Sequence, residues 1–310
     1  MDPAHGLLEN PHDVYRRLRE SAPVHRAAGP DGSPAWLVTR YEDVRAALAD
    51  PRLSLDKARA KEGSYRGLSL PPALDANLLN MDPPDHTRIR RLVARAFTTR
   101  RVEHLRIPIR RTADRLLDAL GPHGTTDLIA AYAAPLPITV ICDLLGVPDD
   151  HRRDFRAWTG ALVAPDPARP TAAKEAVVAM LGFFTGLIAA KRTEPADDLL
   201  SDLIAVRGVT VPAGETVLLS LAAANRDPAR FPDPGRLDLG RDTSGHLALG
   251  HAIHHCLGAP LARAETEIAL AALLERFPEL ALASDAPRWR PSPRARGLVA
   301  LPVTYAEKTS

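Results

Sequence analysis

One short segment constrains this chain more than any other, because it places a single cysteine in a glycine-containing loop directly before a helix. Residues 245–260 read Gly-His-Leu-Ala-Leu-Gly-His-Ala-Ile-His-His-Cys-Leu-Gly-Ala-Pro. Gly250 and Gly258 allow tight turns around Cys256, and apolar residues recur at helical spacing from Leu261 onward. Because unpaired amides at a helix N-terminus favour an anion, the pattern predicts a thiol that is placed to ionise and to bind a soft metal.

This segment resembles the cysteine loop of the cytochrome P450 family, whose signature is Phe-Gly-x-Gly-x-x-x-Cys-x-Gly. Gly250, Cys256 and Gly258 match the signature, whereas Leu249 replaces the phenylalanine and Ala252 replaces a glycine. The resemblance implies that the Cys256 thiolate is the axial ligand of the iron in haem b. It also implies that the two glycines belong to the cofactor-binding loop.

The histidines around Cys256 carry a further implication and leave one alternative open. In the family, the position of His254 commonly holds a basic residue that contacts a haem propionate, and the resemblance gives His254 that role. His251, His254, His255 and Cys256 also offer ligand types that suit zinc. Their spacing matches no common zinc motif, so haem is the favoured interpretation.

A second informative stretch, residues 82–97, opens with two prolines and predicts a helix. His86 and Arg90 are four residues apart and therefore lie on one face, while Ile89 and Val93 lie toward another. Two donors on one face suit a carboxylate, although taken alone the pair also fits a solvated basic face. In the cytochrome P450 family a His-x-x-x-Arg pair contacts the haem propionates, so the resemblance implies this role for His86 and Arg90.

Composition excludes several classes of protein. The chain has 310 residues, 45% of them hydrophobic, and a net charge of +2, which predicts a globular protein without a nucleic-acid partner. The two cysteines, Cys142 and Cys256, lie in different contexts and do not suggest a disulfide framework. No segment has the pattern of a signal peptide or the length of a membrane span, so we expect a cytoplasmic protein with no membrane partner.

The order of elements predicts a mainly α protein with a small β region (α+β), as a single domain over residues 1–310. The segment 133–145 is apolar nearly all round, which predicts a helix that is covered on every side. Helices are expected over 11–20, 41–48, 82–97, 102–120, 133–145, 151–163, 172–191 and 197–204, and strands over 24–27, 35–39, within 208–217 and within 289–303.

The sequence departs from the family after Arg207. A cytochrome P450 would continue with a long distal helix carrying Ala-Gly-x-Glu/Asp-Thr and then a helix with Glu-x-x-Arg, but Gly208 begins a segment that resembles a later strand. We therefore expect an internal deletion at the 207/208 junction and a cytochrome P450-like fold that lacks the distal helix and its neighbours. Arg226 and Arg236, which would ordinarily join the network around Glu-x-x-Arg, are expected to lack partners.

The resemblance implies a haem-thiolate monooxygenase that inserts oxygen into a small hydrophobic or macrolide-like natural product, with a ferredoxin-type electron donor. No catalytic residue is assigned, because the acid–alcohol pair that normally delivers protons is missing and activity is expected to be impaired. One alternative is a catalytically inactive helper of the same fold that docks on a partner enzyme such as a glycosyltransferase. Another is a remnant without activity. Without the distal helix, neighbouring helices must shift inward, the chain must pair with a second copy or a partner protein that covers the exposed core, or it must remain marginally folded, and we favour pairing.

Overall fold

The structure is a computed structural model, and it describes residues 11–29, 32–64, 77–94, 97–145, 147, 149–163, 169, 171–193, 216–284, 287–290 and 296–307. The chain divides into two compact units, each built from two separate stretches of sequence. Unit 1 comprises Met1–Arg95 with Leu199–Ala259, and unit 2 comprises Ala96–Asp198 with Pro260–Ser310. The helix expected over 197–204 and the 207/208 junction lie outside the described residues, and a single domain over 1–310 remains a prediction.

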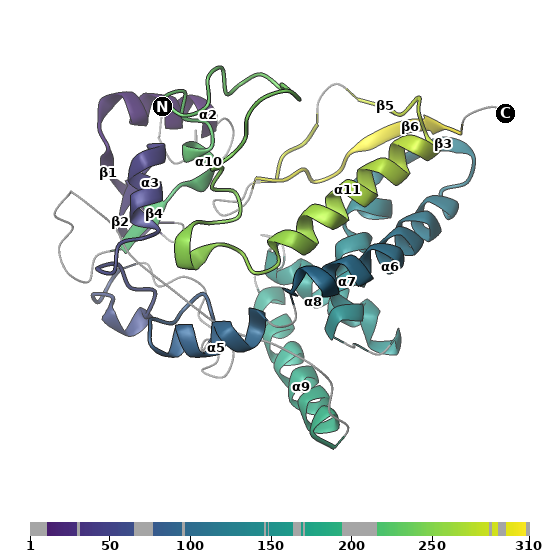
Figure 1. Cartoon of the computed structure of the whole chain (residues 1–310), viewed down its shortest axis with the longest axis horizontal. Coiled ribbons are helices and arrows are strands. Elements are labelled where there is room, and N and C mark those ends of the chain that lie inside the picture. The colour runs from purple at the N-terminus through teal and green to yellow at the C-terminus, as the bar shows by residue number, and fades with distance from the viewer. Residues whose placement is uncertain are drawn as a thin grey trace. The chain divides into compact units, whose positions relative to one another are not determined.

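Unit 1 combines a three-stranded sheet with short helices (Figure 1). The central strand β2 pairs antiparallel with β1 and parallel with β4. The elements of unit 1 are α2 (Pro11–Ser21), β1 (Val24–Ala28), β2 (Pro34–Val38), α3 (Tyr41–Ala47), η1 (Lys57–Arg59), α5 (Asp85–Ala94), β4 (Thr216–Leu219), α10 (Leu221–Ala224) and η5 (Ala252–His254).

The core of unit 1 anchors the segment that leads into the cysteine loop. Tyr41 and Leu247 are both buried in this core, and the Tyr41 hydroxyl donates a hydrogen bond to the carbonyl oxygen of Gly245 at 2.6 Å. The Leu247 amide donates to the side-chain oxygen of Asn225 at 2.6 Å. These contacts hold the start of the loop against α3 and the residue that follows α10.

Unit 2 is mainly helical and contains a second sheet, with strand order β3-β6-β5 and antiparallel pairing throughout. Most of α11 belongs to this unit and lies beside α6 (Figure 1), where Arg106 contacts Glu267. The elements are α6 (Thr99–Asp118), β3 (His123–Asp127), the π-helical turn η3 (Ile129–Ala133), α7 (Pro135–Leu145), η4 (Asp149–His151), α8 (Arg152–Val163), α9 (Ala172–Thr193), α11 (Ala259–Arg276), β5 (Ala281–Leu282) and β6 (Pro302–Ala306).

The core of unit 2 forms where apolar stripes of α6, α7 and α11 meet. Ile109 and Leu117 on α6 are fully buried, as is Phe277 just after α11. The stripe of α11 that sequence spacing predicts is buried at Leu261 and Ile268. A separate aromatic cluster packs α8 against α9, through Phe155, Trp158, Phe183 and Phe184.

The structure confirms the mainly α fold with a small β region and corrects two details. The strand β3 was not predicted, because its sequence His-Gly-Thr-Thr-Asp has no apolar alternation. The strand expected within 208–217 is described only from Thr216 onward. α7 is not covered on every side, since Ile141 is 40% exposed. Within the described part of the chain, no helix is both long and apolar enough to cross a bilayer.

Candidate functional site

The cysteine loop lies in unit 1 and ends at the start of α11. Cys256 is exposed and precedes Ala259, the first residue of α11, by three positions. Its amide donates a hydrogen bond to the carbonyl oxygen of Leu249 at 2.7 Å, which closes the loop across the short helix η5. The expected place of the cysteine, in a closed loop just before a helix, is thus confirmed.

Backbone geometry explains why position 250 of the loop is glycine. Gly250 has φ of 76°, and a Cβ atom at this position would lie 2.3 Å from the carbonyl oxygen of His254. Only glycine fits there, because both the conformation and the space exclude a side chain. Ala252, which replaces a signature glycine, has φ of 51° and is strained by about 1–2 kcal/mol. Gly258 is not in the left-handed region.

The helix α5 places His86 and Arg90 against the cysteine loop. The His86 side chain is buried, and its ring lies 6.3 Å from the His254 ring, centroid to centroid. The guanidinium of Arg90 donates a hydrogen bond to the carbonyl oxygen of His255. Burial lowers the pKa of Arg90, and the charge of ionised Cys256 opposes this effect. The structure therefore brings together the four side chains that the sequence marked.

Burial also changes the titration of His86. It lowers the pKa of His86 to about 4, with smaller contributions from the charges of Arg90 and His254. At neutral pH the ring is therefore uncharged, and it can still donate one N–H bond to a carboxylate. Arg90 has five N–H donors, so its bond to His255 leaves others for the same purpose.

We expect this buried histidine to make the protein acid-sensitive. Because the pKa of His86 is about 4 when folded and about 6.5 when unfolded, the unfolded chain alone takes up the proton as pH falls through 6.5. The contribution of His86 should reduce the free energy of unfolding by about 2 kcal/mol between pH 7.5 and 5. Chemical denaturation at each pH measures this loss.

His86→Gln, which cannot titrate, should remove that part of the pH dependence. His104→Gln at an exposed position of α6 is the matched control and should reproduce the parent profile. An unchanged profile in His86→Gln would contradict the burial argument.

The donor set fits a haem better than a bare metal ion. One thiolate is available for iron, and three basic side chains beside it suit the two carboxylates of the porphyrin. A zinc ion needs about four protein ligands, and the residues that the structure describes contain no group of three or more His, Cys, Asp or Glu side chains able to hold a metal. The zinc alternative through His251, His254, His255 and Cys256 therefore finds no support in the structure.

One charged residue of α11 was missed by sequence reasoning. Glu265 lies beside the apolar stripe of the helix, and burial raises its pKa to about 7. A carboxyl group with this pKa exchanges protons near neutral pH. The signal was an acidic residue next to Ala264 and Ile268 on the buried side of a predicted helix.

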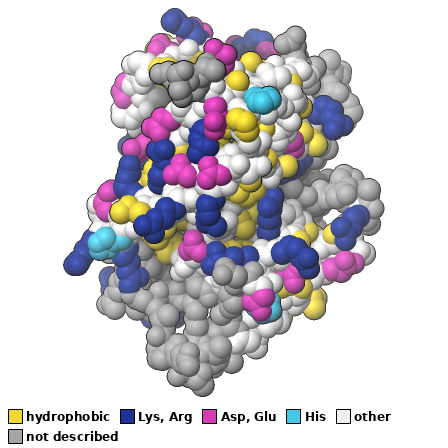
Figure 2. All heavy atoms as spheres, turned by 90° about the vertical axis from the view of Figure 1, so that its right-hand side faces the viewer, with side chains coloured by type: hydrophobic (Ala, Val, Ile, Leu, Met, Phe, Trp, Pro, Cys, Tyr) yellow, Lys and Arg dark blue, Asp and Glu magenta, His cyan; other side chains and the backbone are white. Residues whose placement is uncertain are grey.

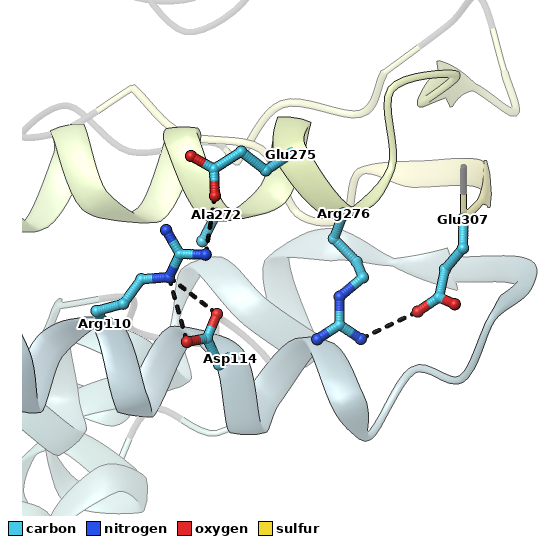
Figure 3. A pocket seen from close by; sticks show the side chains of 6 residues that line it. All are labelled: Arg110, Asp114, Ala272, Glu275, Arg276 and Glu307. Carbon is cyan, nitrogen blue, oxygen red and sulfur yellow. Dashed lines mark hydrogen bonds and ion pairs between the residues drawn. The ribbon is translucent and has the colours of Figure 1, made fainter. Parts of the chain in front are cut away.

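A polar cavity of about 420 Å³ opens between α6 and α11 in unit 2 (Figure 3). Its arginines already bind carboxylates: Arg110 contacts Glu275 at 2.8 Å, and Arg276 contacts Glu307 at 3.0 Å. Figure 2 shows basic and acidic side chains next to one another over the face it displays. We interpret this arrangement as an ion-pair network that joins the two helices, and it contains no sequence-predicted site residue. The cavity is lined by Arg110, Asp114, Ala272, Glu275, Arg276 and Glu307.

Comparison with known proteins shows the family to which the chain belongs. Residues 199–306 match the Cytochrome P450 family. Over 96% of its length the chain is 40% identical to Cytochrome P450 107B1 of Saccharopolyspora erythraea, with 95% of that protein covered. It is 39% identical to the Cytochrome P450 monooxygenase PikC of Streptomyces venezuelae, over 96% of this chain and 91% of that protein.

The chain belongs to the cytochrome P450 family. Its structure is also similar to that of the cytochrome P450 PksS of Bacillus subtilis, with a TM-score of 0.86, 29% identity, and coverage of 99% of this chain and 100% of that one. Membership implies a haem iron cofactor.

The alignment with the Saccharopolyspora cytochrome P450 also shows that this chain lacks an internal segment. It extends over 389 positions, whereas 96% of 310 residues is only about 298. About ninety aligned positions, the difference between 389 and 298, therefore have no residue of this chain opposite them. This cytochrome P450 is internally truncated, as the sequence predicted, and the position of the deletion at 207/208 remains a prediction.

Proposed function

We propose that this chain binds haem b through Cys256 and is a truncated monooxygenase of the cytochrome P450 family. The observation that carries the proposal is the meeting of α5 with the cysteine loop, where His86 and Arg90 lie beside His254 and Cys256. The family, the loop conformation at Gly250 and the donor set all support it.

Each of these residues has a definite task in the proposal. Cys256 binds the iron, His86, Arg90 and His254 bind the propionates, and Gly250 keeps the loop closed without a side chain. Arg90 additionally holds the loop through the His255 carbonyl. When bound, haem supplies oxygen activation, which the thiolate ligand supports by donating electron density.

The names of two relatives support the proposed class of substrate. Among proteins 35% identical to this chain are a 6-deoxyerythronolide B hydroxylase and a Mycinamicin IV hydroxylase/epoxidase. We propose a small hydrophobic or macrolide-like substrate and a ferredoxin-type donor. The cytoplasmic location remains a prediction.

The truncation supports impaired turnover, and it also fits a second candidate function, that of a catalytically inactive helper. Ile141 of α7 is exposed and about ninety aligned positions are missing, which supports an apolar core that is left partly uncovered. We propose that a second copy of the chain or a partner protein covers this surface. A catalytically inactive helper that docks on an enzyme such as a glycosyltransferase would use the same exposed surface without needing haem.

An absorption spectrum of the purified protein, reduced and treated with carbon monoxide, separates these functions. A thiolate-type Soret band is the result expected for the haem protein. Complete absence of a Soret band after haem reconstitution would overturn the haem proposal and favour the helper.

Arg90→Ala should weaken haem binding. Removing one charge-assisted hydrogen bond from a shielded site costs about 1.5–3 kcal/mol, which corresponds to about 10- to 150-fold in affinity. Haem transfer to apomyoglobin measures the loss. The neighbouring Arg91→Ala, on the exposed side of α5, is the matched control and should retain haem like the parent. Equal retention in both variants would contradict the role of Arg90.

A further inference from the structure

A loop that follows α10 in unit 1, residues 232–241, is stabilised by hydrogen bonds from its side chains to its own backbone. The guanidinium of Arg241 donates hydrogen bonds to the carbonyl oxygens of Pro232, Asp233 and Arg236, the last two at 2.8 and 3.1 Å. The carboxylate of Asp238 accepts a hydrogen bond from the Gly240 amide at 3.0 Å. Because these bonds fix the backbone on both sides of residue 237, the loop is stiff before any partner binds.

This loop holds two leucines almost entirely in solvent. Leu237 is 86% exposed and Leu239 is 95% exposed, the largest values among the exposed large apolar side chains of the described residues. Arg236, beside them, is also exposed, and within the described part of the chain its side chain makes no hydrogen bond or ion pair. Apolar side chains on a rigid loop beside an arginine without a partner are typical of a binding surface, because little conformational entropy is lost on association.

We propose that residues 236–239 form the contact between two copies of this chain. The sequence Arg-Leu-Asp-Leu is self-complementary in charge. When two such segments run antiparallel across a twofold axis, Arg236 faces the partner subunit's Asp238, and Asp238 faces the partner's Arg236. Leu237 then meets the partner's Leu237 on the axis, and Leu239 lies beside this pair opposite the partner's Gly235, so that the leucines of both copies leave water. This contact is separate from the cover proposed for α7, and it does not depend on haem.

The small size of the contact predicts a weak dimer. Two leucines from each copy and two ion pairs between the copies cover much less than the roughly 1,200–2,000 Å² of a standard stable interface. We therefore expect a dimer that dissociates on dilution in the micromolar range.

Reversing the charge of either ion-pair residue tests the proposal, with the dissociation constant of the dimer measured by sedimentation equilibrium across a dilution series. Arg236→Asp and Asp238→Arg should each raise the dissociation constant at least tenfold, because like charges then face each other. An equimolar mixture of the two variants should form heterodimers again, since opposite charges are restored across the axis. Recovery in the mixture cannot arise from a folding defect in either variant.

Apolar variants complete the test. The double variant Leu237→Ser with Leu239→Ser should be monomeric, while Leu79→Ser, at another exposed leucine of unit 1, should dimerise like the parent. A parent that is monomeric at every concentration, or a dimer that survives both the leucine and the charge changes, would overturn the proposal. Absorption spectra on the same samples keep the two proposals apart, because loss of the haem band with the dimer intact contradicts only the haem site.

Discussion

Cys256→Ala should abolish the thiolate-type band of the reduced, carbon monoxide-treated protein. Cys256 is exposed in a closed loop before α11, with Arg90 near enough for their charges to interact. Alanine leaves no anionic ligand for the iron. Any haem that the variant retains should absorb as haem without thiolate ligation.

Cys142→Ala is the internal control for this result. Cys142 is fully buried on α7, and burial raises the pKa of its thiol, so the group stays protonated and inert. The variant should keep the band, with some loss of stability from the cavity it creates. Persistence of the band in both variants would refute the assignment of Cys256.

Gly250→Ala should have the next largest effect, on the loop rather than on the ligand. The added Cβ would lie 2.3 Å from the His254 carbonyl oxygen, and φ of 76° is itself unfavourable for alanine. The conformation alone costs about 1–3 kcal/mol, and the overlap forces the backbone of His254 to move. We expect at least a tenfold loss of haem affinity, measured by haem titration.

The matched control is Gly235→Ala in the same unit. Nothing lies within 4 Å of a Cβ atom at Gly235, and its backbone is not left-handed. This variant should bind haem like the parent. If Gly250→Ala also binds haem normally, the closed loop is not required for the cofactor.

The candidate site was predictable because its signals are local. The cysteine loop is specified by glycines and a helix start within a few residues, and the His86–Arg90 pair by a spacing of four on one helix. What the sequence could not show is that Arg90 contacts the backbone of His255. That carbonyl lies 165 residues away and carries no side-chain signal.

The fold was predictable where apolar periodicity is strong and not where it is weak. α6 has a clear apolar stripe, whereas β3 is built from polar residues and takes its place by pairing with β6. Exposure of Ile141 is also invisible locally, because periodicity reports which faces are apolar and not what covers them. The same limit applies to Leu237 and Leu239, which a sequence pattern would bury.

The interleaving of the two units has a consequence for synthesis on the ribosome. Unit 1 is tied together by contacts such as Arg19 to Ala223, 204 residues apart, and unit 2 by Arg106 to Glu267, 161 residues apart. At about 5–20 residues per second, the first strands wait many seconds for β4, and α6 waits a somewhat shorter time for α11. Unit 1 cannot close before residue 259 has emerged, and unit 2 cannot close before α11 and β6 have emerged, so the nascent protein keeps apolar faces exposed for most of its synthesis. We therefore expect chaperone binding during translation to govern the yield of folded protein.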